Sequence, residues 1–222
     1  MPIGDWPHQV LLASTSPRRH ELLALLDLEF EVERPDVDEH CDPCEAPAQA
    51  AQRLAREKVE SVRREKRDGV LIIAADTIVV QDNEILSKPE HASDAKSMLR
   101  RLRGRSHEVV TAIAVTGESD MLLHEDACTT QVQVREFTDH LLESYVATGD
   151  PMDKAGAYGI QNNQFRLATP VNGCLANVIG LPLCHLVRTL RRVNVHTSVD
   201  VPHICQMHIE YDCPVYESIL SA

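Results

Sequence analysis

A chain of 222 residues with 43% apolar and 25% charged residues is long enough for one sizeable core or for two lobes beside a cleft, and it is too apolar to be disordered. The net charge of -12 argues against a nucleic acid polymer as partner, and only 4% aromatic residues leave few rings for stacking bases. No apolar run reaches the roughly 18 residues of a membrane span, no basic signal-peptide segment precedes the first apolar run, and seven cysteines suit a reducing compartment. We therefore expect a cytoplasmic protein without a membrane partner.

The first half of the chain alternates short apolar runs with helical patterns. The run at residues 10–13 leads to Ser16, a favourable N-cap, and to Pro17, which suits the first turn of a helix. An acidic stretch with three prolines at residues 33–47 predicts a loop that holds at most a short strand, and residues 48–67 predict a long surface helix. Residues 70–75 and 78–80 predict an extended apolar segment on both sides of Asp76 and Thr77.

The second half of the chain predicts a hairpin between helices. A helix capped by Ser93 covers residues 93–103 and ends at Gly104, and the stretches 109–115 and 129–134 form paired strands joined through residues 117–120. Thr138 opens a helix over residues 140–147, a glycine-rich segment follows at 149–159, and Pro182 begins a closing helix that ends at Arg192. This pattern predicts an α/β protein with a mixed sheet flanked by helices. We assign residues 8–193 to one domain and residues 194–222, which show no clear periodicity, to a C-terminal extension of unknown role.

Two serines and two arginines lie where the first predicted strand leads into a helix. The free backbone N–H groups and the positive end of a helix attract anions, and Arg18 and Arg19 add donors beside the hydroxyl groups of Ser14 and Ser16. The segment therefore has two interpretations, a phosphate-binding turn or an ordinary N-cap followed by exposed arginines. The local pattern does not choose between them.

Asp76 is an acid inside an apolar extended segment. A buried carboxylate costs free energy unless a metal, a cation or hydrogen bonds compensate it. It is therefore a candidate Mg²⁺ ligand or a general base that activates water, and the alternative is an acid paired with a structural Arg or Lys. The other charged candidates, each more often a surface residue when taken alone, are Glu39, Lys58, Lys88 and Lys154.

Other signals carry less weight. Cys41 and Cys44 have C-x-x-C spacing, and the C-terminal residues His203, Cys205, His208 and Cys213 could join them in a zinc site, but this spacing matches no usual pairing. The two standard glycine-rich loops that cradle nucleotides are absent from the sequence.

Taken together, several segments resemble the Maf family of nucleoside triphosphate pyrophosphatases. They occur in the family's order and span most of the chain, from residue 11 to about residue 192. The matching pieces are Leu12-Ala13-Ser14-Thr15-Ser16-Pro17-Arg18-Arg19, Leu54-Ala55-x-x-Lys58, Ala75-Asp76-Thr77, Lys88-Pro89, Gly104-x-x-His107-x-Val109-x-Thr111, Asp153-Lys154-Ala155-Gly156-Ala157-Tyr158-Gly159-Ile160-Gln161 and Gly180-Leu181-Pro182.

The resemblance implies a fold with two lobes around a central nucleotide-binding cleft. It implies that Asp76 is the general base and, with Glu39, holds a divalent metal, Mg²⁺ or Mn²⁺. It also implies that Arg19, Lys58 and Lys88 lie near the phosphates and that Ser14 and Ser16 belong to the phosphate-contacting turn. Lys154 lies in the glycine-rich loop as a further phosphate candidate. Members of the family often form homodimers, so we expect a homodimer.

Three positions separate the dTTP/UTP-preferring group of that family from the group that prefers 7-methyl-GTP. Here they are Arg18, Thr77 and Gln161, and all three match the dTTP/UTP group, whereas a Trp at position 18 would indicate the other. The chain departs from the family pattern at several positions, namely Asp38 where Glu is usual, Ser87 where an acid or Gly is common, and Asn162-Asn163 where a Gly commonly follows Gln161.

We therefore expect a metal-dependent pyrophosphatase that converts dTTP, UTP or modified pyrimidine triphosphates to the monophosphate and pyrophosphate. A metal can neutralise phosphate charge, a carboxylate can activate water, and cations can stabilise the leaving pyrophosphate. The first alternative is a nucleotide-binding sensor linked to cell division with little turnover. The second is a redox or zinc protein that uses the cysteines and histidines named above.

Overall fold

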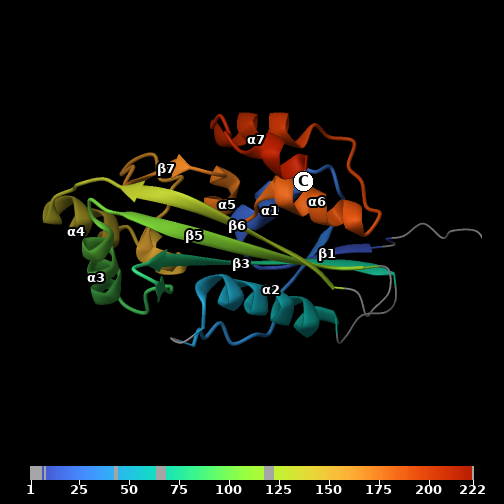
Figure 1. Ribbon diagram of the computed structural model, residues 1–222. Helices are drawn as coiled ribbons and strands as arrows, with labels where there is room; N and C mark the ends of the chain where they lie inside the picture. The colour runs from blue at the N-terminus through green and yellow to red at the C-terminus, as the bar shows by residue number, and fades with distance from the viewer. Residues whose placement is uncertain (1–6, 8, 43–44, 64–68, 118–122, 222) are drawn as a thin grey trace, which may run out of the picture.

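The computed structural model describes residues 7, 9–42, 45–63, 69–117 and 123–221. They form one mixed sheet of seven strands in the order β2-β1-β3-β5-β6-β7, and β4 pairs with β3 outside this path. Helices cover both faces of the sheet (Figure 1), which confirms the predicted α/β class. Within these residues, no helix is long and apolar enough to cross a membrane.

The first three strands in the sheet order form its parallel part. β1 (Gln9–Ala13) pairs in parallel with β2 (Glu31–Glu33) on one side and with β3 (Val70–Gln81) on the other. α1 (Pro17–Ala24) connects β1 to β2, and α2 (Pro47–Arg63) lies between β2 and β3 in the chain. Parallel neighbours need such crossover connections, since a tight turn can join only antiparallel strands.

The long strand β3 changes neighbours along one of its sides. Residues 70–73 pair in parallel with β1, and residues 79–81 pair antiparallel with β4 (Glu84–Leu86). Its other side pairs with β5 (Ser106–Thr116) all the way from Ile73 to Val80. On the first side, the described structure pairs no strand with residues 74–78, and we call these residues the open edge of β3.

The antiparallel part of the sheet contains the predicted hairpin. β5 pairs with β6 (Leu123–Val134) along its whole length, and β6 pairs in turn with β7 (Ala168–Asn172). Most of the predicted connection between β5 and β6 lies outside the described residues. The remaining elements of this half are α3 (Ala92–Leu102), α4 (Asp139–Ala147), the short 3₁₀ helices η1 (Asp150–Asp153) and η2 (Ala155–Ala157), α5 (Leu175–Ile179) and α6 (Leu183–Arg192).

Three apolar clusters hold these layers together because successive side chains of a strand point to opposite faces. Leu11, Ile72 and Ala74 pack against α2, whereas Leu12 and Ile73 pack against α1, α5 and α6 on the other face. The third cluster joins α3, α4 and η2 to the far ends of β3, β5 and β6. Figure 1 shows α2 alone below the sheet, α1, α5 and α6 above it, and α3 and α4 at its left end.

The C-terminal extension is helical and packs onto the rest of the chain, although its sequence has no clear periodicity. α7 (Val201–Ile209) and α8 (Tyr216–Leu220) lie outside α6, and Val201, Cys205 and Ile219 join the core on that face. The backbone carbonyl of Ile219 accepts a hydrogen bond of 3.2 Å from Arg188. The extension therefore covers α6 as part of the same folded body.

Most of the expected elements occur, with differences at their ends. Ser16 and Thr138 are the N-caps of α1 and α4, and Gly104, with a φ of 69°, follows the end of α3. The N-cap of α3 is His91 rather than Ser93, and the backbone N–H of His91 donates to Asp94 at 2.8 Å. The strand β2 and the helix α5 have no counterpart of that length among the expected elements, because they span only three and five residues.

Candidate active site

A cleft of about 810 Å³ lies beside the open edge of β3. One wall comes from the turn before α1 and from α2, and the other from Lys88, η1 and the loop after η2. Ser14 lies behind the first wall, with 4% of its surface exposed. The other residues expected in the site all line the cleft: Ser16, Arg18, Arg19, Glu39, Lys58, Asp76, Thr77, Lys88, Lys154 and Gln161.

Strand alternation explains how Asp76 and Thr77 serve two different parts of the site. Asp76 lies on the same face of β3 as Ile72 and Ala74, so its carboxylate points towards α2. Thr77 lies on the opposite face, towards α1 and α5. Two adjacent residues on the open edge therefore contact different cations, Lys58 and Arg19, on opposite faces of the sheet.

On the α2 face, two carboxylates and two ammonium groups form a chain. Lys58 belongs to the buried stripe of α2, and its Nζ contacts Asp76 Oδ1 and lies 2.7 Å from Glu39 Oε1. Lys88 Nζ lies 2.7 Å from Glu39 Oε2. Asp76 and Lys58 are 5% and 3% exposed, so each compensates the buried charge of the other.

The charge state of Glu39 follows from these contacts. Burial alone would raise its pKa, but the ammonium groups of Lys58 and Lys88 outweigh that effect and hold the pKa of Glu39 at about 2. The Glu39 carboxylate is therefore ionised at neutral pH. Its side chain is 45% exposed, whereas that of Asp76 is buried, so Glu39 is the outer and Asp76 the inner of the two carboxylates.

On the other face, the guanidinium group of Arg19 is held by three acceptors. Nε donates to Gly180 O at 2.9 Å, Nη2 to Thr77 Oγ1 at 2.9 Å and Nη1 to Ser14 Oγ at 3.4 Å. Burial lowers the pKa of Arg19, and the charges of Asp76 and Glu39 oppose this shift. Since the ordinary pKa of an arginine is above 12, Arg19 keeps its charge. The group is therefore a fixed cation beside the cleft.

The serine turn before α1 is organised by its own side chains. Ser14 Oγ accepts a hydrogen bond from the Ser16 backbone N–H at 3.2 Å, in addition to the one from Arg19. Ser16 is the N-cap of α1, but its own side chain makes no capping hydrogen bond. The hydroxyl of Ser16 and the positive end of an eight-residue helix thus lie at the cleft.

Asp153 connects two expected phosphate-binding cations across the cleft. Its Oδ2 lies 3.2 Å from Arg18 Nη1, and its Oδ1 lies 2.6 Å from Lys154 Nζ. Arg18 comes from α1, whereas Lys154 directly follows η1, so this contact joins the two walls. The side chain of Asp153 is 62% exposed, and such a surface pair contributes about 0–1 kcal/mol to stability.

The carboxylates of this site fit a divalent ion that arrives with its substrate. Mg²⁺ prefers oxygen ligands and is usually bound through one or two carboxylates together with substrate phosphates. Asp76 and Glu39 provide two such groups, joined through Lys58. The described residues contain no group of three or more His, Cys, Asp or Glu side chains placed to hold a metal. These residues therefore do not provide a complete set of protein ligands for a metal ion.

Several residues of the cleft were not among those expected from the sequence. Asp150 and Tyr158 line it, and Thr111 supports Thr77 from behind, with 2.9 Å between their hydroxyl oxygens. Asn177 is fully buried and fixes Thr111 by accepting from its backbone N–H at 3.1 Å. The pattern of the sequence contains no signal for these contacts, because Thr111 lies opposite Thr77 only through the antiparallel pairing of β3 with β5.

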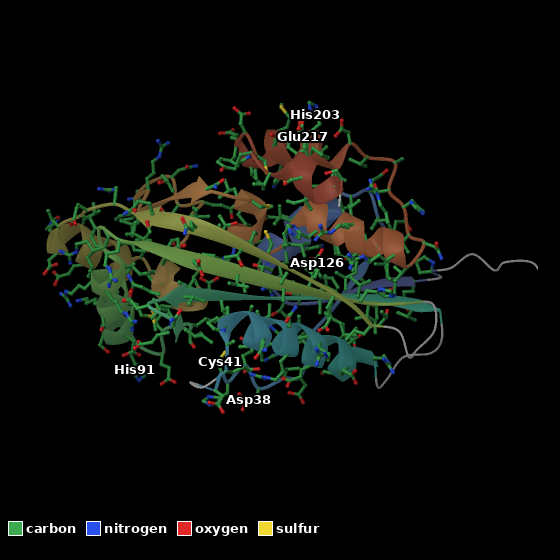
Figure 2. The ribbon with its side chains drawn as sticks, in the orientation of Figure 1. Asp38, Cys41, His91, Asp126, His203 and Glu217 are labelled. Carbon is green, nitrogen blue, oxygen red and sulfur yellow. The ribbon has the colours of Figure 1, made fainter. Side chains whose placement is uncertain are left out.

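Cys41 of the acidic loop lies apart from the C-terminal extension. Cys41 lies on the α2 side of the sheet, whereas His203 lies on the opposite side, above α6 (Figure 2). Cys41 lines the cleft near Glu39, and Cys44 lies outside the described residues. The structure thus separates Cys41 from the C-terminal residues that a shared zinc site would require.

The fold and the cleft define a mixed α/β protein with a polar site suited to a small polyanion. The family model described as "Maf-like protein" matches residues 9–193, and the chain belongs to this family. Its relatives include three dTTP/UTP pyrophosphatases: that of Geobacter sulfurreducens is 47% identical over 186 residues, which are 83% of this chain and 96% of that protein. That of Geotalea uraniireducens is 46% identical over 83% of this chain and 94% of that protein. That of Aquifex aeolicus is 43% identical over 84% of this chain and 96% of that protein.

Solved structures that resemble the chain share less of it. A nucleoside-triphosphatase, also titled dITP/XTP pyrophosphatase, from Mycobacterium abscessus has a TM-score of 0.39 and 18% identity, covering 57% of this chain and 72% of that one. The Staphylococcus aureus Ham1 protein has a TM-score of 0.40 and 16% identity, covering 57% of this chain and 71% of that one.

Proposed function

We propose that the chain is a nucleoside triphosphate pyrophosphatase that releases pyrophosphate and the nucleoside monophosphate, with dTTP and UTP as preferred substrates. The observation that carries this proposal is the placement of Asp76 at the open edge of β3, next to two sets of cations. Lys58 and Lys88 lie on one side, and Arg19 lies on the other. Relatives at 43–47% identity that bear the name dTTP/UTP pyrophosphatase support it.

The reaction assigns a task to each group. The carboxylate of Asp76 orients a water molecule and accepts its proton as the water oxygen attacks the α-phosphorus. The bond from that phosphorus to the bridging oxygen breaks, and pyrophosphate leaves with the electron pair. Lys88 and Arg19 stabilise the negative charge on the phosphate oxygens, because fixed cations in a partly closed cleft interact more strongly than they do in water.

Lys58 holds both carboxylates in place, since its single ammonium group contacts Asp76 and Glu39 together. We also propose that Asp76 and Glu39 hold a Mg²⁺ or Mn²⁺ ion. When bound, that ion would neutralise phosphate charge and polarise the phosphoryl oxygen.

The preference for dTTP and UTP rests on Arg18, Thr77 and Gln161. Thr77 lies on the face of β3 that Arg19 contacts, and Gln161 lies on the opposite wall of the cleft. Arg18 extends from α1 to Asp153 on that wall. The three residues thus surround the cleft from different elements, which suits a role in distinguishing one bound nucleotide from another.

The test is pyrophosphate release with Mg²⁺ or Mn²⁺ across dTTP, UTP, CTP, 7-methyl-GTP and modified pyrimidine triphosphates. We expect release to concentrate on the pyrimidine nucleotides, to stop with a chelator and to fall by about 10²–10⁴-fold in Asp76→Asn, the range of a general base. Circular dichroism of the variant checks that it folds.

Three results would count against the proposal in different ways. Wild-type turnover by folded Asp76→Asn would exclude the role of Asp76. Release from 7-methyl-GTP alone would keep the reaction but exclude the pyrimidine preference. Tight nucleotide binding without release from any substrate would indicate a nucleotide sensor instead.

A further inference from the structure

The carboxylate of Asp150 connects three segments on the wall of the cleft opposite Asp76. Its Oδ2 accepts hydrogen bonds from Tyr145 Oη at 2.6 Å and from Asn162 Nδ2 at 3.1 Å. Its Oδ1 accepts one from Lys154 Nζ at 3.1 Å. Tyr145 belongs to α4, Lys154 follows η1, and Asn162 lies in the loop after η2, so one carboxylate ties these segments together.

The loop formed by residues 159–165, which we call the amide loop, is fixed at its beginning and through Asn162 in its middle. At its beginning, the Gly159 backbone N–H donates to Tyr145 Oη at 2.9 Å. In its middle, Asn162 Oδ1 accepts from the backbone N–H groups of Gln164 and Phe165 at 3.2 and 3.1 Å. Since Tyr145 is fully buried, the anchor is rigid.

These contacts engage both the oxygen and the nitrogen of the Asn162 side-chain amide. The side-chain amides of the neighbouring residues are not engaged in this way. Gln161, Asn163 and Gln164 line the cleft, and their side-chain amides make no hydrogen bond to any residue that the structure describes. A carboxamide offers both donors and an acceptor, the combination that pairs with the polar edge of a nucleobase. The amide loop therefore supplies the cleft with groups that can recognise a base.

Lys154 completes the arrangement rather than adding a free cation. An ammonium group has three donors, and Lys154 Nζ makes three contacts, with Asp150 O at 2.7 Å, Asp150 Oδ1 and Asp153 Oδ1. Burial alone would raise the pKa of Asp150, but the hydrogen bonds from Tyr145, Lys154 and Asn162 lower it instead. Asp150 is thus a charged acceptor at neutral pH.

We propose that Asp150 is a positioning residue for base recognition: by holding Tyr145 and Asn162 with one carboxylate, it keeps the amide loop in the single arrangement that discriminates between nucleobases. This inference rests on the proposed function for its substrate class. Asp150 itself contacts neither the phosphates nor the attacking water in this scheme. Its loss should therefore change which nucleotide is preferred more than it changes the chemical step.

The experiment compares Asp150→Ala and Tyr145→Phe with the wild type, using kcat and KM for UTP, CTP and GTP in parallel. We expect the ratio of kcat/KM for UTP to that for the poorest nucleotide to fall about tenfold in both variants, mostly through changes in KM. A tenfold change corresponds to the loss of about one hydrogen bond that distinguishes the two nucleotides. The kcat for UTP should stay within about threefold of the wild type.

Two further variants separate positioning from general stability. Asp150→Asn keeps an oxygen that can accept from Tyr145 and Asn162, so it should restore the discrimination ratio to within about threefold of the wild type. Asp139→Ala is the matched control, because Asp139 is an acid at the start of α4 that pairs with Arg103 away from the cleft. That control should leave the ratio unchanged.

A readout without catalysis keeps this inference separate from the proposed function. Hydrogen exchange of the Gly159, Gln164 and Phe165 amides should accelerate at least about tenfold in Asp150→Ala and not in Asp139→Ala. Calorimetry with non-hydrolysable UTP, CTP and GTP analogues should show the same loss of discrimination in binding. An unchanged binding ratio, with or without turnover, would overturn the role of Asp150. Absence of turnover with discrimination lost as expected would overturn the proposed function alone.

Discussion

Removing the side chain of Asn177 is a quantitative test of how the cleft is supported. Asn177 is fully buried on α5, and its amide makes three hydrogen bonds. Oδ1 accepts from Thr111 N–H at 3.1 Å, and Nδ2 donates to Val109 O and Thr130 Oγ1, both at 2.9 Å. Thr111 in turn contacts Thr77, which binds Arg19, so this amide supports the cation site from behind.

The expected cost of Asn177→Ala follows from these contacts. Three hydrogen bonds at about 1 kcal/mol each set a lower estimate of about 3 kcal/mol. Leaving the backbone groups of Val109 and Thr111 without this partner adds to it, because a buried polar group without its hydrogen bond costs about 1–3 kcal/mol. Thr130 is less affected, since its Oγ1 also donates to Cys174 O at 3.0 Å. We expect a loss of about 4 kcal/mol, or a fall in Tm of roughly 8–16 °C for a chain of this size.

Urea unfolding followed by circular dichroism measures this loss directly, with the denaturant slope checked for a change. Asn163→Ala is the matched control, because the exposed side chain of Asn163 has no partner in the described structure, and its stability should change by less than about 0.5 kcal/mol. A loss below about 1 kcal/mol for Asn177→Ala would refute the argument that this amide supports β5 and the residues in front of it.

Three further predictions concern other parts of the fold. Gly180→Ala should cost about 1–3 kcal/mol and lower kcat/KM, because the backbone has a φ of 126° there and a Cβ would lie 3.4 Å from Arg19 Nε; thermal unfolding and turnover measure the two effects. Burial lowers the pKa of His107 to about 4, so the folded state favours the neutral imidazole. The contribution of His107 to the free energy of unfolding is therefore complete above about pH 6.5. It decreases by about 1.4 kcal/mol per pH unit as the pH falls towards 4. Urea unfolding of His107→Phe between pH 7 and 4.5 should show a flatter pH dependence than the wild type. Ile219→Ala should destabilise the whole chain by about 2–4 kcal/mol in a single transition, whereas separate early melting of the extension would contradict its place in the core.

The parts of the site that depend on one strand could be predicted from the sequence. Asp76 is identifiable because an acid inside an apolar run must have a partner, and strand alternation then places Thr77 on the opposite face. The serine turn is identifiable because a strand leads directly into a helix that begins with Ser16 and Pro17. These features are local, and local patterns survive the packing of the rest of the chain.

The parts that depend on distant segments could not be predicted in this way. Asp150 meets Tyr145 and Asn162 only because η1 and η2 turn the chain back on itself, and no periodicity encodes that path. Gly180 accepts from Arg19 across 161 positions of the sequence. The helices α7 and α8 could not be predicted because they have only nine and five residues, and tertiary packing rather than propensity stabilises such short helices. The homodimer and the cytoplasmic location stay predictions.

The open edge of β3 also affects how the protein avoids aggregation. Unpaired strand edges are templates on which another chain can add a strand, and proteins usually protect them with charges, prolines or covering segments. Residues 74–78 would span only about 17 Å, and β1 and β4 occupy the same side of β3 at either end of them. A foreign strand cannot extend past these neighbours, and the charged side chain of Asp76 opposes an apolar one. The open edge beside the cleft is therefore too short to accept another polypeptide.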